Sequence, residues 1–62
     1  EGWLILIGKG LVSARPVRVY SSDGKLAWSG KLGPGDGRLV IKLKAGFYLV
    51  QVGFRRFKAI VY

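Results

Sequence analysis

The sequence predicts an all-β domain, an antiparallel sandwich or small barrel of six or seven short strands. Apolar and polar side chains alternate with a period of two in several segments, as they do on a strand with one buried face. Glycine, proline and aspartate supply turn signals about every eight to twelve residues, and no helical periodicity extends beyond one turn. A chain of 62 residues is long enough for a single domain, which we expect to span 1–62.

The segment from Gly46 to Gly53 is the expected centre of this domain. Aromatic and β-branched residues dominate the stretch between the two glycines, and these types suit a pleated strand. Alternation places Tyr48, Val50 and Val52 on one face, and the other face is apolar as far as Gln51. Since a strand that is apolar on nearly both faces lies inside a sheet, we predict a central strand here. Gly46 is expected to adopt a backbone geometry that a Cβ atom opposes.

Further strands and turns follow from the same signals. Strands are expected over 3–7, 17–20, 25–32, 38–44 and 57–62, whereas 11–15 can be a short strand or an extended link. Asp23-Gly24 between two alternating runs predicts a tight hairpin, because glycine accepts a positive φ. A wide turn is expected over 33–37 and a short hairpin loop over 53–56. The predicted core is Leu4, Leu6, Val17, Val19, Leu26, Trp28, Leu39, Ile41, Leu43, Tyr48, Val50, Val52 and Ile60.

Composition limits the chemistry that the chain can perform. It contains no cysteine, histidine or methionine, which excludes disulfides, the usual Cys/His zinc sites and Cys-His or Ser-His pairs. Asp23 and Asp36 are the only interior acids, and both stand beside glycines, where aspartate favours turn geometry. We therefore expect a protein that is not an enzyme and has no cofactor or catalytic residue. No run approaches the roughly 20 apolar residues of a membrane span.

The charge balance favours anionic partners. Eleven lysine and arginine residues oppose three acids, which gives a net charge of +8. Nucleic acid, an acidic polysaccharide or a membrane surface would be attracted, although basic side chains also serve simply as the solvated face of a small sheet. The candidate recognition surface is Arg55, Arg56, Phe57 and Lys58. The candidate aromatic residues for stacking on a ligand are Trp3, Tyr20 and Tyr62.

From Val17 onward the order of these segments resembles a known family. Val17-Arg18-Val19-Tyr20 leads into Ser22-Asp23-Gly24-Lys25 and Trp28-Ser29-Gly30, and an Ile41-Leu43 strand then precedes Ala45 to Val52 and Lys58-Ala59-Ile60-Val61. This succession is similar to the C-terminal sorting domains of the type IX (Por) secretion system, which are small immunoglobulin-like β-sandwiches. Residues 1–16 lack the Asn-Pro opening common in that family.

The resemblance implies an immunoglobulin-like accessory module at the C-terminal end of a larger, secreted or cell-surface protein. Its function would be secretion sorting or surface attachment, its partners would be the upstream domain and the secretion machinery, and Lys58 would be the basic member of the recognised hairpin. Two alternatives stay open. One is a carbohydrate-binding module of a secreted enzyme, and the other is a small basic domain that binds nucleic acid.

Overall fold

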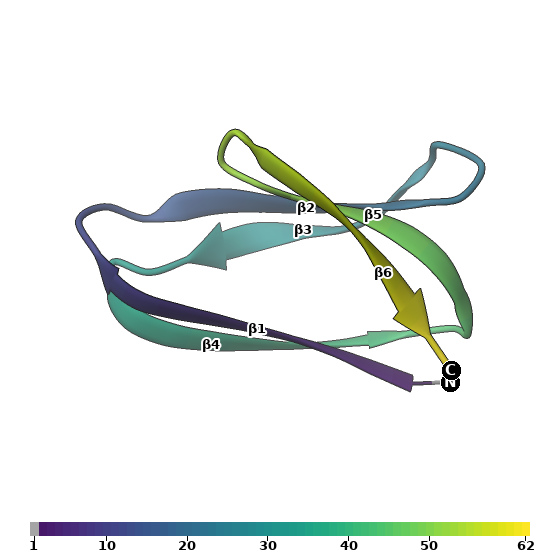
Figure 1. Ribbon diagram of the computed structural model, residues 1–62, viewed down its shortest axis with the longest axis horizontal. Coiled ribbons are helices and arrows are strands. Elements are labelled where there is room, and N and C mark those ends of the chain that lie inside the picture. Colours follow the sequence, from purple (N-terminus) through teal and green to yellow (C-terminus); the bar gives the residue numbers. More distant parts are fainter. Residues whose placement is uncertain (1) are drawn as a thin grey trace.

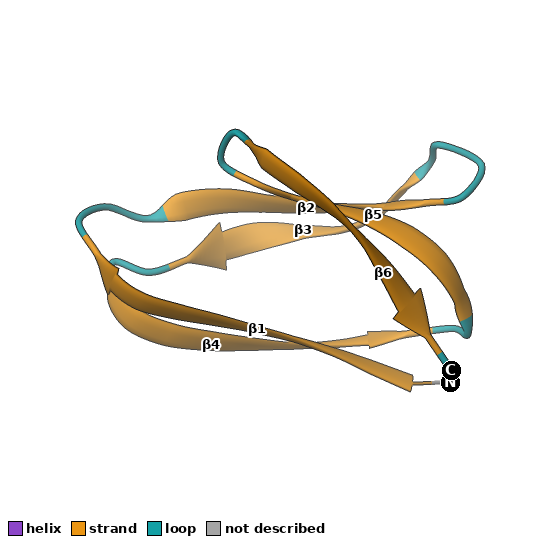
Figure 2. Ribbon diagram, viewed as in Figure 1, coloured by secondary structure: helices purple, strands orange, loops and turns teal. Residues whose placement is uncertain are grey.

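The computed structural model describes residues 2–62, and all regular structure in this part of the chain is β-strand (Figure 2). The strands are β1 (Gly2–Leu11), β2 (Arg15–Ser21), β3 (Leu26–Leu32), β4 (Gly35–Leu43), β5 (Gly46–Val52) and β6 (Arg55–Val61). The prediction of an all-β domain with six or seven strands is confirmed. No helix in residues 2–62 is long and apolar enough to cross a membrane.

The six strands form two antiparallel sheets, one layered on the other (Figure 1). β1 pairs with β4, and the second sheet has the order β3-β2-β5-β6. If β1 is equated with strand B of an immunoglobulin sandwich, the first sheet corresponds to B–E and the second to C′–C–F–G. The described chain therefore has the strand order of an immunoglobulin-like sandwich that lacks strands A and D.

β5 lies inside the four-stranded sheet, between β2 and β6, as the sequence predicted. Val50 at its middle pairs with Val19 on one side and with Phe57 on the other. The side chain of Val50 is fully buried, and Tyr48 and Val52 are half-buried on the same face. The apolar composition of both faces of this segment reflects its central position in the sheet.

The core fills the space between the two sheets and is entirely apolar. Its buried members are Val17, Val19, Leu32, Ile41, Leu43, Val50 and Val61. Half-buried residues packed against them include Leu4, Leu6, Leu11, Trp28, Leu39, Tyr48, Val52 and Ala59. Within residues 2–62 no side-chain nitrogen or oxygen is buried without a hydrogen-bond partner, so the core carries no unsatisfied polar group.

The core prediction is wrong for two residues, Leu26 and Ile60, which are exposed. Leu26 is exposed because the β2–β3 register shifts between Val19 and Tyr20, which places Leu26 opposite Tyr20 on the outer face. A β-bulge of this kind breaks the alternation that linked Leu26 to Trp28. Ile60 is exposed because it pairs with Phe47 on the outer face, and Val61 faces the core instead.

The glycine-rich stretch at 33–37 is mostly strand, which corrects the predicted wide turn. Only Gly33 and Pro34 lie between β3 and β4, and they are joined by a cis peptide bond. Gly35 pairs with Leu11 and Gly37 with Gly8, so β1 is also longer than expected. The loop predicted at 53–56 is likewise shorter, since β6 begins at Arg55. The segment 12–14 is a link and not a strand.

Tyr48 stabilises the β4–β5 connection, where the chain passes from one sheet to the other. Its hydroxyl donates a hydrogen bond of 2.6 Å to the carbonyl oxygen of Lys44, four residues earlier. A tyrosine near the start of strand F makes a bond of this type in immunoglobulin domains, and β5 occupies that strand position here. The bond therefore supports the alignment of strands given above.

Replacing Tyr48 by phenylalanine is expected to lower the free energy of unfolding by about 1 kcal/mol, because the Lys44 carbonyl loses its donor while the ring remains. Urea unfolding followed by tryptophan fluorescence measures this loss. Tyr62→Phe is the matched control, since the side chain of Tyr62 is 90% exposed. An equal effect of both changes would contradict the role of the Tyr48 hydroxyl.

Candidate functional site

The candidate site lies on the outer face of the four-stranded sheet, which we call the recognition face. Because Val17, Val19 and Val50 point into the core, the side chains between them point outward. Cross-strand pairing arranges these outward residues in four rows. The first row holds Lys31 and Pro16, the second holds Ser29, Arg18, Gln51 and Arg56, the third holds Leu26, Tyr20, Leu49 and Lys58, and the last holds Phe47 and Ile60.

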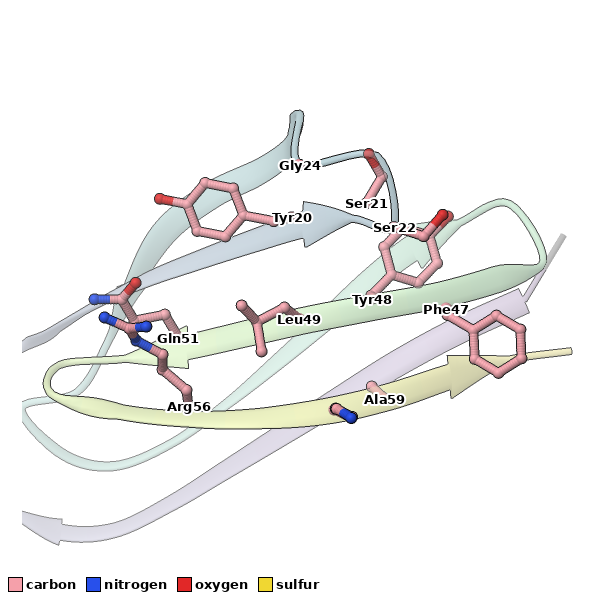
Figure 3. A pocket seen from close by; sticks show the side chains of 11 residues that line it. Tyr20, Ser21, Ser22, Gly24, Phe47, Tyr48, Leu49, Gln51, Arg56 and Ala59 are labelled. Atoms are coloured by element: carbon pink, nitrogen blue, oxygen red, sulfur yellow. The ribbon is translucent and has the colours of Figure 1, made fainter.

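A hollow of about 600 Å³ opens on this face and extends toward the β2–β3 hairpin (Figure 3). Its lining comprises Tyr20, Ser21, Ser22, Gly24, Phe47, Tyr48, Leu49, Gln51, Arg56, Lys58 and Ala59. In Figure 3 the Gln51 and Arg56 side chains lie together at one end and the Phe47 ring at the other. The hollow thus passes from a polar, basic end to an apolar end.

The recognition face is predominantly positive. Four basic side chains project from it, namely Arg18, Lys31, Arg56 and Lys58, and all four are exposed. Of the two acids in the described chain, Asp36 lies in β4, and Asp23 lies in the β2–β3 hairpin between Ser22 and Gly24, which line the hollow. Since the four cations outnumber this one nearby carboxylate, the face presents a positive potential to an approaching anion. Tyr20 and Ser22 add hydroxyl groups that can donate to the same anion, whereas the Ser21 hydroxyl donates to Asp23.

The predicted recognition surface on β6 is divided between two faces. Arg56 and Lys58 point onto the recognition face, opposite Gln51 and Leu49. Phe57 pairs with Val50 on the inner side, although its position on an edge strand leaves it partly exposed. Arg55 also points to that side and lines a smaller hollow of about 350 Å³ with Leu11, Arg15, Val52 and Phe54. The structure therefore brings only half of this predicted set together.

The three predicted stacking aromatics do not form one surface, because Tyr20 is on the four-stranded sheet whereas Trp3 and Tyr62 lie where the start of β1 meets the end of the chain, with Gly2 against the Tyr62 backbone. Tyr20 lines the hollow on the recognition face. Trp3 lies on the outer face of the two-stranded sheet, where the Lys42 ammonium group stands 5.7 Å from the centre of its ring. Tyr62 follows β6 and is exposed. The sequence analysis did not include Phe47 among the candidate aromatic residues, although Phe47 also lines this hollow. Alternation along β5 places Phe47 on the face opposite to Tyr48, and that pattern indicated an outward ring.

Asp23, Gly24 and Gly46 have the structural roles that were expected of them. The loop Ser22–Asp23–Gly24 is closed by hydrogen bonds between Ser21 and Lys25 and between Gly24 and Ser21, and Gly24 has a φ of 87°. The Ser21 hydroxyl and the Lys25 N–H both donate to the Asp23 carboxylate, and these two bonds lower the pKa of Asp23 below its ordinary value. Gly46 has a φ of 155° at the β4–β5 corner.

Asp36 also has a structural partner. Its carboxylate accepts a 2.6 Å hydrogen bond from the N–H of Gly10, at the point where the β1–β4 register shifts. The bond satisfies a backbone donor that the bulge removes from the ladder. Within residues 2–62 there is no group of three or more histidine, cysteine, aspartate or glutamate residues that could hold a metal ion.

No protein-family model, curated protein or solved structure matches this chain. The recognition face itself is therefore the feature of this protein that bears on its function.

Proposed function

We propose that this chain is a non-catalytic accessory module that delivers or attaches a larger protein to the cell surface by binding an anionic partner on the recognition face. The observation that carries the proposal is the hollow over β2, β5 and β6, in which the cations Arg56 and Lys58 stand beside apolar side chains. Cations, hydroxyls and apolar side chains line it, and these groups suit binding. The order of strands and turns that resembles sorting domains supports delivery to the secretion machinery or the cell surface as the purpose of that binding.

The chemistry of the hollow favours a partner with both an anionic and an apolar part. Arg56 and Lys58 supply charged donors at neighbouring positions of β6, and Gln51 stands beside Arg56. The side-chain amide of Gln51 donates to the carbonyl of Gly53 at 3.3 Å, which orients its oxygen as a possible acceptor. Phe47 and Leu49 offer the apolar contact. Charge-assisted hydrogen bonds of this kind are about twice as strong as neutral ones.

A second candidate function is the binding of an acidic polysaccharide. The observation in its favour is that Tyr20 and the hydroxyl of Ser22 line the same hollow as the two cations. A ring beside hydroxyl donors can pack against a sugar ring while the cations hold its carboxylate. In this reading the module would bring a secreted enzyme or surface protein to its glycan.

The proposal predicts that reversing both β6 charges abolishes delivery. A reporter carrying this module at its C-terminus is expressed in a host that has the type IX secretion system, with Arg56→Glu/Lys58→Glu as the test variant. Arg38→Glu/Lys44→Glu is the matched control, because it lowers the net charge equally at two exposed residues outside the recognition face, one on β4 and one between β4 and β5. The test variant should remain inside the cell and the control should reach the surface. Retention of the unchanged module inside the cell would contradict sorting.

Direct binding separates the two candidates. The purified module is mixed with a uronic-acid polysaccharide, an uncharged glucan and single-stranded oligothymidine. Polysaccharide attachment predicts capture by the uronic-acid polymer that falls roughly tenfold to a hundredfold in the Arg56→Glu/Lys58→Glu variant. Tight binding of oligothymidine with an affinity that falls steeply with salt would instead identify a nucleic-acid partner. Equal binding by the two charge variants would overturn the assignment to the recognition face.

A further inference from the structure

The free edge of β1 lacks the features that usually protect an exposed edge strand. β1 is ten residues long and is hydrogen-bonded only to β4 within the described chain. It approaches β6 where it begins, since a Cβ on Gly2 would lie 2.6 Å from Cγ1 of Val61. Natural edge strands are usually protected by charges, prolines, bulges or short length. Residues 2–8 contain no charge and no proline, and the bulge comes only between Gly8 and Leu11.

The outer face beside this edge is apolar. Trp3, Ile5 and Ile7 alternate along β1 and are all more than half exposed, and Val40 continues the stripe on β4. On the inner face Leu4 and Leu6 reach only half burial, because no further strand stands beside β1 to cover them. A complete immunoglobulin sheet has strand A at this position, and an added strand would cover apolar surface on both sides of β1.

The charged side chains around the apolar residues Trp3, Ile5 and Ile7 indicate which kind of added strand would fit this edge. Arg38 and Lys42 stand on β4 directly opposite Ile7 and Trp3, and Lys9 follows on β1. In residues 2–62 the one acid on this outer face is Asp36, which alternates with Arg38 along β4 and accepts the Gly10 N–H beyond residues 4–8 of β1. The net charge of +8 opposes the docking of two copies through the same edge. The fit is to an extended segment whose outward residues are acidic.

We propose that the β1 edge accepts an extended, acidic strand from a partner protein by β-strand addition, and that this strand fills the position of strand A. Backbone hydrogen bonds along residues 4–8 provide the affinity, and alternate apolar side chains of the partner pack beside Leu4 and Leu6. Its acidic side chains lie on the same outer face as Lys42 and Arg38, which stand on the other side of β1. This interaction is independent of the recognition face, because it uses the other sheet.

The test uses amide hydrogen exchange of the whole chain with defined nine-residue peptides. One peptide alternates valine and glutamate, a second alternates valine and lysine, and a third is the acidic peptide with N-methyl groups on alternate backbone nitrogens. At a concentration about ten times its Kd, the acidic peptide should slow exchange of the β1 edge amides roughly tenfold and leave the edges of β3 and β6 unchanged. The lysine peptide and the N-methylated peptide should have no such effect.

Matched variants locate the site. Ile5→Glu should abolish the protection, whereas Ile60→Glu, at a residue that is likewise 53% exposed but on the other sheet, should retain it. Ile7→Glu serves as a second β1 variant if Ile5→Glu fails to fold, as judged by circular dichroism. Full protection by the N-methylated peptide, or none by the acidic peptide, would overturn the proposal. Concentration-dependent dimerisation lost in Ile5→Glu would also overturn it and would assign the edge to a second copy.

Discussion

Replacing Val50 by aspartate is expected to abolish folding. Val50 has no exposed surface and stands at the middle of β5, the strand that joins β2 to β6. On the inner face of β5 and β6, which Val50 shares, the one basic side chain is Arg55, and it pairs with Val52 at the end of the sheet. A carboxylate at position 50 would therefore be buried without a partner, which costs several kcal/mol. A domain of this size has a total stability of roughly 3–9 kcal/mol, so the loss exceeds what it can tolerate.

Val40→Asp is the control for this change. Val40 has the same side chain and also lies in the interior of a strand, but it is exposed on the outer face of β4. It should keep a cooperative thermal transition, at a cost of about 1 kcal/mol for replacing a β-branched residue in a strand. Far-UV circular dichroism during heating records both variants. A wild-type-like transition in Val50→Asp would show that β5 is not central.

Replacing Ile41 by alanine is expected to have the second largest effect, a loss of about 2–4 kcal/mol in the free energy of unfolding. Ile41 is 2% exposed and is the largest fully buried side chain of β4. Removing its outer methyl and methylene groups sacrifices their transfer free energy and leaves a cavity between the sheets. The effect should appear as a lower urea midpoint with an unchanged slope, because the surface exposed on unfolding changes little.

Ile5→Ala provides the comparison on the same sheet. Ile5 lies on the paired strand and is exposed, so its truncation should cost less than about 1 kcal/mol. The ratio of the two effects measures which side of the β1–β4 sheet faces the core. Equal losses would mean that both faces of this sheet are covered in the isolated chain.

Much of this fold could be predicted from the alternation of apolar and polar residues along each strand. The wrong core predictions show where this alternation is insufficient. The inward positions of Val17 and Val19 follow directly from a period of two, and the central place of β5 follows from the apolar residues on both of its faces. Leu26 was assigned to the core because it lies two residues from Trp28, but the register shift between Val19 and Tyr20 moves it to the other face. A bulge depends on the pairing of two strands, and neither strand alone carries its signature.

The candidate site was predictable only in part for a similar reason. Four successive residues on β6 looked like one surface, yet a strand presents them alternately, and only Arg56 and Lys58 reach the recognition face. Their neighbours Gln51 and Arg18 come from β5 and β2, and the register that aligns them is a property of the folded sheet. The prediction of a wide turn over 33–37 was wrong for a related reason. Gly35 and Gly37 are held in β4 by pairing with β1, and pairing overrides the local turn preference.

The measurement that tests the account most directly is a methyl–methyl nuclear Overhauser spectrum of the chain labelled at isoleucine, leucine and valine. Both proposed binding surfaces require that the sheets enclose the apolar core and leave their other faces outside. The account predicts cross-peaks that join Ile41 or Leu43 of β4 to Val17, Val19 or Val50 of the other sheet, and none from Ile5 to those valines. Cross-peaks from Ile5 to those valines, with none from Ile41, would contradict it.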